Sequence, residues 1–213
     1  MLALGGAGVV AAWGVPSSPG GTVASTTTST EPAPPPEDQA DGTPTGTVLI
    51  RQGTKFVRLR ALRRLRLGTE LDTRKGRITL RAHDRSRGSF YGGRFKLARG
   101  DDTPLPGRRA RRLLALVLTG GDFTKCKSRT TAGAGVVAVE PVRYAWGNAS
   151  GSFRTTGRFA AATVRGTLWR TADFCNGTEI LVKRGKVDVI DRVKHKHVLV
   201  TAGHSYMALA KRS

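Results

Sequence analysis

Acidic residues are scarce in this chain, and lysine and arginine are missing from its beginning. The 213 residues contain 15 Asp and Glu against 36 Lys and Arg, a formal net charge of +21. Residues 1–46 contain no Lys or Arg and four acids, so the remaining 167 residues have 36 basic and 11 acidic side chains, a net charge of +25. Such a surface attracts polyanions, and nucleic acid, anionic lipid and anionic cell-wall polymer all fit it.

The sequence also lacks the motifs that identify common enzyme sites. It has no GxxxxGKS or GxxxxGKT phosphate loop and no GxSxG nucleophile elbow, and the stretch GNASGSF at 147–153 indicates a Gly/Ser loop. We therefore predict that the protein is not an enzyme and holds no cofactor. The acids available for a paired-carboxylate mechanism have no spacing that selects two of them; they are Asp173, Glu179, Asp188 and Asp191.

Candidate metal ligands are few. His195 and His197 form an HxH pair, and on one strand both side chains would lie on the same face. Lys194 and Lys196 flank the pair and would repel a cation. The sequence therefore predicts an exposed basic strand here and no metal site.

Only two cysteines are present, Cys126 and Cys175. The absence of a CxxC motif excludes the usual zinc and thioredoxin-like arrangements. In a cytosolic protein the two would be thiols, whereas in an exported protein they would be joined. We predict a disulfide between them.

The first 46 residues indicate export. Residues 1–15, MLALGGAGVVAAWGV, are apolar and shorter than the roughly 20 residues of a membrane-spanning helix. They are either a signal-like or membrane segment, which could tether the protein, or a mobile apolar terminus without a targeting role. Residues 16–46 are rich in Pro, Ser, Thr and acids, a composition typical of a disordered linker. We expect an extracytoplasmic location, at the cell surface or secreted.

Residues 47–210 have the pattern of an all-β domain, with about ten short strands in a Greek-key-like or jelly-roll-like assembly. The phrases GTVLI at 46, GRITL at 76 and GKVDV at 185 each indicate a Gly turn followed by a strand. Residues 58–66 and 107–118 also fit a short helix, and for the second we favour a strand. The strand candidates are 48–51, 55–62, 76–82, 88–97, 113–118, 135–139, 152–155, 161–169, 179–183, 186–191 and 197–202.

The segment ATVRGTLW at 162–169 is the most specific of these. Gly166 in mid-strand suggests a bulge or the close approach of another backbone. Trp169 is expected to anchor the core, and the alternative is an exposed Trp that stacks on a sugar.

These phrases resemble FecR-like domains, an extracytoplasmic module of bacterial envelopes. The resemblance runs over residues 46–206, through TGTVLIRQG, LGTELDTRKGRITL, FAAATVRGTLW, GTEILVKRGKVDV and HVLVTAG, with an insertion-like stretch at 99–147. The chain is similar to Arg-rich members from actinobacteria, and it lacks the cytoplasmic anti-sigma helix bundle of signal-transduction members. The resemblance implies that the strand at 162–167 and the hairpin at 185–189 pair with the strands at 46–50 and 76–80. The positions that carry it are Gly76, Thr163, Arg165, Gly166, Thr167, Trp169, Gly185 and Gly203.

The resulting expectation is a non-catalytic extracytoplasmic module that binds or senses a protein partner or an anionic envelope polymer. The alternative is a nucleic-acid-binding protein driven by charge. We favour the first because the Arg residues are scattered through the predicted strands and no aromatic RNA-stacking motif is present.

Overall fold

A computed structural model describes residues 32–101, 112–124, 126, 140–164 and 166–211. Every strand belongs to one compact unit, Ala33–Ser213. Four predicted features lie wholly or mostly outside the described residues: the N-terminal segment 1–15, the linker, the strand candidate 135–139 and Arg165.

The described part of the chain contains fifteen strands and no helix, which confirms the all-β class. The number of strands exceeds the predicted ten for two reasons. The predicted strands 88–97 and 161–169 are each two strands, and the strands at 63–66, 143–149 and 205–209 are absent from the prediction. The strands are β1 (Gln39–Gln52), β2 (Lys55–Leu59), β3 (Arg63–Arg66), β4 (Glu70–Arg81), β5 (Arg87–Tyr91), β6 (Arg94–Asp101), β7 (Arg112–Leu118), β8 (Arg143–Ala149), β9 (Phe153–Thr156), β10 (Ala160–Val164), β11 (Thr167–Phe174), β12 (Gly177–Arg184), β13 (Lys186–Asp191), β14 (Lys196–Thr201) and β15 (Ser205–Leu209).

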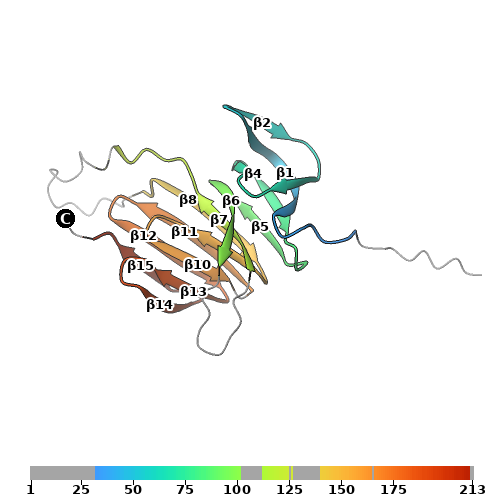
Figure 1. Ribbon diagram of the computed structural model, residues 1–213. Helices are drawn as coiled ribbons and strands as arrows, with labels where there is room; N and C mark the ends of the chain where they lie inside the picture. The colour runs from blue at the N-terminus through green and yellow to red at the C-terminus, as the bar shows by residue number, and fades with distance from the viewer. Residues whose placement is uncertain (1–31, 102–111, 125, 127–139, 165, 212–213) are drawn as a thin grey trace, which may run out of the picture. The chain divides into compact units, whose positions relative to one another are not determined.

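Twelve strands form one nearly closed sheet, in the order β14-β13-β10-β9-β7-β6-β4-β5-β8-β11-β12-β15. Neighbours are antiparallel except β7 and β9, which are parallel. β1 pairs with β4 and also with β2 and β3, so these three strands extend the sheet beside β4 (Figure 1).

The first strand begins at Gln39, inside the segment predicted to be a disordered linker. β1 is paired on both sides, with β3 at Gln39–Gly42 and with β4 at Asp41–Ile50. These partners lie 20 to 40 residues further along the chain, so the composition of the segment gave no indication of them.

The two segments with a helical alternative are strands. Residues 113–118 belong to β7, a central strand between β6 and β9 whose side chains are buried on both faces. Residues 58–66 end β2 and form β3. Leu65 is buried there, whereas Leu62, at helical spacing from it, is 66% exposed in the connection between the strands.

Aromatic side chains from four strands meet in the core. The ring centroid of Phe90 lies 6.1 Å from Phe95, 5.3 Å from Phe153 and 6.1 Å from Trp169. Trp169 is completely buried and its Nε1 donates a hydrogen bond to Thr155 Oγ1 over 2.8 Å. The prediction that Trp169 anchors the core is confirmed, and the sugar-stacking alternative is wrong for this residue.

Three glycines form corners between strands. Gly166 separates β10 from β11, Gly185 separates β12 from β13, and Gly203 separates β14 from β15, with φ of 70°, 80° and 83°. Strands β10, β13 and β14 are neighbours in the sheet, and so are β11, β12 and β15. At Gly166 and Gly203 the chain passes from the first set to the second, and at Gly185 it returns to the first. The corners touch, because a Cβ on Gly185 would lie 2.4 Å from the carbonyl oxygen of Gly166, and the amide of Gly203 donates to the carbonyl of Val182.

The backbones of Gly166 and Gly185 approach each other, but a Cβ on Gly166 would meet no atom within 4 Å, so the crowding predicted at Gly166 falls on Gly185. The single strand predicted over 161–169 is wrong. The chain turns at Gly166, since a left-handed φ lets it change sheet partners there. Thr163 ends up buried and accepts a hydrogen bond from Arg154 Nε over 2.9 Å, while Thr167 donates one to the carbonyl of Arg184.

The turn predicted at Gly185 is correct, whereas Gly46 and Gly76 do not lie in turns. They face each other across β1 and β4, and a Cβ on Gly76 would lie 2.5 Å from the carbonyl oxygen of Thr47. The long-range pairing implied by the resemblance is also wrong. β1 pairs with β4 and β10 pairs with β13, so the upstream and downstream phrases each pair among themselves.

The predicted disulfide is confirmed, because Cys126 and Cys175 are joined. It links the connection after β7 to the turn between β11 and β12, at a sequence separation of 49.

Replacing Gly185 by Ala should destabilise the fold more than replacing Gly203 by Ala. Both side chains would meet the cost of a left-handed φ, about 1–2 kcal/mol, but only Gly185 has a backbone oxygen in the way. We expect Gly185→Ala to lower the free energy of unfolding by about 2 kcal/mol more than Gly203→Ala. Urea unfolding of both variants measures this, and equal losses would contradict the packed corner.

Removing the disulfide with Cys126→Ala and Cys175→Ala should lower the free energy of unfolding by about 4 kcal/mol, because the bridge restricts the unfolded chain. Urea unfolding measures the loss. Thiol titration of the denatured wild-type protein, purified without reductant, should detect no free thiol, and two free thiols would contradict the bridge.

Candidate anion-binding surface

Several acidic side chains of the described residues are held by arginines. Asp41, buried on β1, accepts hydrogen bonds from Arg64 Nε over 2.9 Å and from Arg81 Nη2 over 3.0 Å. Burial alone would raise the pKa of the Asp41 carboxyl, but the hydrogen bonds and charges of the two guanidinium groups outweigh it. Its pKa therefore lies below the ordinary 3.8.

The beginning of β4 repeats this arrangement. Glu70 accepts hydrogen bonds from Arg51, Arg94 and Thr119 at 3.0, 3.2 and 2.8 Å. Burial would raise the pKa of Glu70, but these hydrogen bonds and the arginine charges hold it below the ordinary 4.5. Asp72, the next acid of this strand, accepts a hydrogen bond from Arg74 Nη2 over 2.6 Å.

The four carboxylates considered as catalytic candidates each have their own partner. Asp173 is fully buried and accepts from Arg143 Nε over 2.7 Å and from Thr178 Oγ1 over 2.5 Å. Glu179 accepts from Arg170 Nη2, Asp188 lies 3.4 Å from His197 Nδ1, and Asp191 accepts from Tyr206 over 2.7 Å.

The histidine pair is not on one strand. His195 lies in the turn between β13 and β14 with φ of 51°, and only His197 belongs to β14. The expectation of a common strand face is therefore wrong. In the described ranges, no group of three His, Cys, Asp or Glu side chains is arranged to hold a metal ion.

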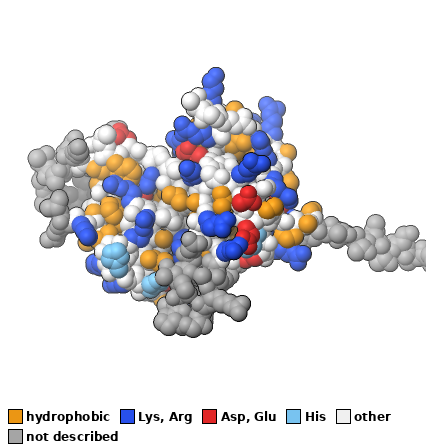
Figure 2. Space-filling view, in the orientation of Figure 1, with side chains coloured by type: hydrophobic (Ala, Val, Ile, Leu, Met, Phe, Trp, Pro, Cys, Tyr) orange, Lys and Arg blue, Asp and Glu red, His pale blue; other side chains and the backbone are white. Residues whose placement is uncertain are grey.

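The basic side chains that remain gather on what we name the basic arm, residues 48–66, which comprise the end of β1, all of β2 and β3, and the connections between them. Residues 42–69 contain seven Lys and Arg and no acid. Arg51 and Arg64 bind Glu70 and Asp41, and among the described residues no acid pairs with the side chains of the other five. All five are exposed; they are Lys55, Arg58, Arg60, Arg63 and Arg66. Figure 2 shows Lys and Arg side chains over the part of the surface formed by β1, β2 and β4.

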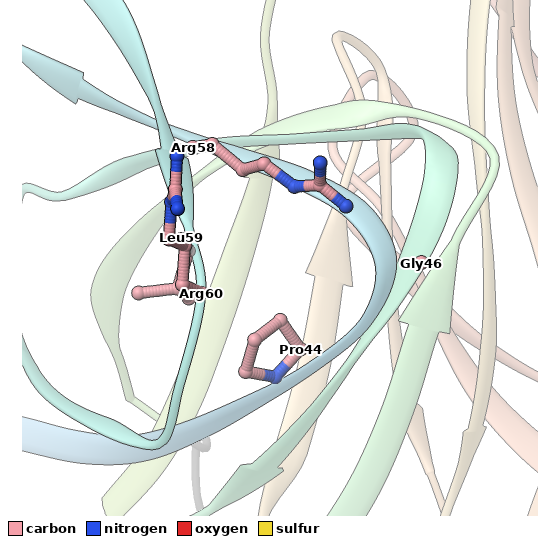
Figure 3. Close-up of a pocket in the computed structure, with 5 residues that line it drawn as sticks. All are labelled: Pro44, Gly46, Arg58, Leu59 and Arg60. Carbon is pink, nitrogen blue, oxygen red and sulfur yellow. The ribbon is translucent and has the colours of Figure 1, made fainter.

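A hollow of about 390 Å³ lies at the base of the basic arm. Arg58, Leu59 and Arg60 form one wall, and Pro44 and Gly46 of β1 form the other (Figure 3). A second hollow of about 670 Å³, between β1 and β4, is lined by Thr47, Leu49, Asp72, Arg74 and Lys75. Guanidinium groups bind phosphate and carboxylate in two-point hydrogen bonds, so the arm suits an anion better than an electrophilic substrate.

Comparison with protein-family models, with curated proteins and with solved structures found no match. Among the described residues, no helix is long and apolar enough to cross a membrane.

The basic arm was not predicted from the sequence, because the arginines are scattered through all the predicted strands. One signal was present, namely the run of 28 residues, 42–69, without an acid. The acids that neutralise other arginines could not be assigned from the sequence, because Asp41 meets Arg81 across 40 residues of chain.

The fold should lose stability in acid through these pairs. Because the folded-state pKa of Asp41 lies below its unfolded value, its stabilisation is present above about pH 4 and is lost as pH falls through the folded-state pKa. We expect Asp41→Asn to lower the free energy of unfolding at pH 7 by about 1.5–3 kcal/mol and to make its decline between pH 5 and about pH 2 shallower. Urea unfolding across this pH range measures both effects.

The control is Glu140→Gln, at an exposed residue that takes no part in the Arg64–Asp41–Arg81 group. It should leave the pH profile unchanged. A profile of Asp41→Asn that parallels the wild type would contradict the role of the Arg64–Asp41–Arg81 group.

Proposed function

We propose that this chain is a non-catalytic extracytoplasmic module that binds an anionic polymer of the bacterial envelope through the basic arm. The observation that carries the proposal is the contrast between the two kinds of charge. The acids near the arm are bound internally by Arg51, Arg64, Arg81 and Arg94. Five cations of the arm have no such partner within the described part of the chain and face solvent.

Charge of this kind favours a long, flexible anion over a compact ligand. The hollow beside Arg58 and Arg60 has little apolar lining, which comes from Leu59 and Pro44. A polymer with repeated phosphate or carboxylate groups could contact several guanidinium groups at once, and each contact would release a counterion.

Export is supported by the disulfide, by the apolar segment 1–15 and by the resemblance to FecR-like domains. Disulfides persist in oxidising compartments, where envelope polymers are also found.

Nucleic acid is the competing ligand, and the one aromatic side chain of the arm argues against it. Phe56 on β2 has the guanidinium carbon of Arg94 at 4.6 Å from its ring centroid and that of Arg51 at 5.7 Å. Single-stranded nucleic acid is bound by stacking its bases on uncovered aromatic rings. With Phe56 covered, the arm offers charge without a stacking surface.

The test is binding of the purified chain to poly(glycerol phosphate), compared with a variant in which Arg58, Arg60, Arg63 and Arg66 are each replaced by Gln. We expect the variant to bind about 10- to 100-fold more weakly at 150 mM salt, with a slope of affinity against salt lower by about two to four counterions. Isothermal titration calorimetry at three salt concentrations measures both.

A matched control removes the same number of charges elsewhere, with Gln at Lys186, Arg192, Lys194 and Lys211, all exposed and outside the arm. It should retain most of the affinity. Equal losses in the two variants would show that binding follows net charge alone and sink the proposed surface, and tighter binding to DNA than to the polymer would favour the competing function.

A further inference from the structure

Four side chains from four neighbouring strands form one row on the outer face of the sheet. Arg77 of β4 pairs with Tyr91 of β5. Tyr91 also pairs with Trp146 of β8, and Trp146 pairs in turn with Arg170 of β11. The row faces outward because residues next to its members along the strands, Phe90 and Trp169, are in the core. β5 and β8 lie between β4 and β11 in the sheet (Figure 1).

The four side chains are stacked on one another. The guanidinium carbon of Arg77 lies 4.0 Å from the ring centroid of Tyr91, and that of Arg170 lies 5.8 Å from the ring of Trp146. The two rings are parallel within 10°, with centroids 6.4 Å apart. At this separation parallel rings are offset, so each leaves part of its face uncovered and the row is a stepped aromatic surface between two cations.

Hydrogen-bonding groups border the row. Ser89 and Asn148 are the partners in the adjacent row of the same face, and Arg184 Nη2 donates to Asn148 Oδ1 over 3.2 Å. Ser89 also lies 3.3 Å from Arg77 Nη1. On the other side Tyr144 is 38% exposed, an unusual degree for a large aromatic residue on a sheet.

The charge of this face is positive. Arg77 and Arg184 are exposed, and the acid that the row contacts, Glu179, is bound to Arg170 Nη2 over 2.6 Å. A ligand that lies along the row therefore meets guanidinium groups beside aromatic carbon and polar side chains.

We propose that this face is a second binding site, which takes the sugar rings of an acidic polysaccharide. The inference rests on the proposed function, since it identifies the chemistry of the polymer, and the row itself is separate from the basic arm. The apolar C–H face of a sugar ring packs on the stepped surface of Tyr91 and Trp146. Its hydroxyls reach Ser89 and Asn148, and a carboxylate or phosphate on the ring reaches Arg77.

The offset rings favour a sugar over a nucleic-acid base. A base stacks by covering most of an aromatic ring with its own flat ring. Here Arg77 already covers one face of Tyr91, and Trp146 and Tyr91 cover part of each other. A puckered sugar ring with hydroxyls at its rim needs only part of each ring and uses the polar groups beside them.

The test uses polygalacturonate, an acidic polysaccharide, and poly(glycerol phosphate), which is anionic but has no sugar ring. We expect Trp146→Leu and Tyr91→Leu each to weaken polygalacturonate binding by about five- to ten-fold, as for the loss of one aromatic contact. Trp146→Phe should retain most of the affinity. All three should bind poly(glycerol phosphate) within about two-fold of wild type, because that polymer uses the arm.

Fluorescence gives a second readout that does not depend on affinity. In a Trp13→Phe background the two remaining tryptophans are the buried Trp169 and the partly exposed Trp146. Saturating polygalacturonate should shift the emission to shorter wavelength and reduce acrylamide quenching. Leu199→Ala, an exposed apolar residue on β14, is the control and should change neither binding nor emission.

Several outcomes would overturn the inference. The first two are that the wild type does not bind polygalacturonate, or that both Leu variants bind it with wild-type affinity. The others are that the Leu variants lose affinity equally for the two polymers, or lose affinity only for oligo(dT). If the wild type binds both polymers and the row variants behave like wild type, only this inference fails. If the wild type binds neither polymer, the proposed function fails with it.

Discussion

The left-handed corners at Gly166, Gly185 and Gly203 are the constraint on which the C-terminal half of this sheet depends. Each one moves the chain between the strands around β13 and the strands around β12, so the two sets can form opposite parts of a nearly closed sheet. Because the corners touch, a side chain at Gly185 would push against the backbone of Gly166. The crossing also brings Trp169 of β11 against Thr155 of β9, which closes the core with a hydrogen bond between strands that do not pair.

Arginine has two roles in this protein, and the location of the acids separates them. Where an acid is buried, as at Asp41, Glu70 and Asp173, arginines from other strands neutralise it and tie those strands together. Because acids are fewer than basic residues, other cations stay exposed at the surface, among them those of the basic arm and Arg77 of the outer row. The same shortage of acids thus accounts for internal pairing and for a cationic exterior.

The interpretations that rested on local pattern are largely correct. The β class follows from alternation and turn residues, β7 was favoured over a helix, and Trp169 is in the core. Those that needed partners distant in sequence are wrong. Residues 39–46 were assigned to a linker because their composition offers little to bury, yet they are held by β3 and β4. The local pattern indicates turns at Gly46 and Gly76, but they are close-packed partners in adjacent strands.

By itself the sequence determined that the protein is all-β, strongly basic after residue 46 and joined between Cys126 and Cys175. These properties depend on composition, on alternation along single strands and on there being two cysteines to pair. Only the tertiary structure decided which arginines are neutralised and which are free, and that Arg77, Tyr91, Trp146 and Arg170 form one row. The reason is that register between strands is set by packing of the whole sheet, so residues about 60 positions apart, such as Gly88 and Ala149, become neighbours without any local signal.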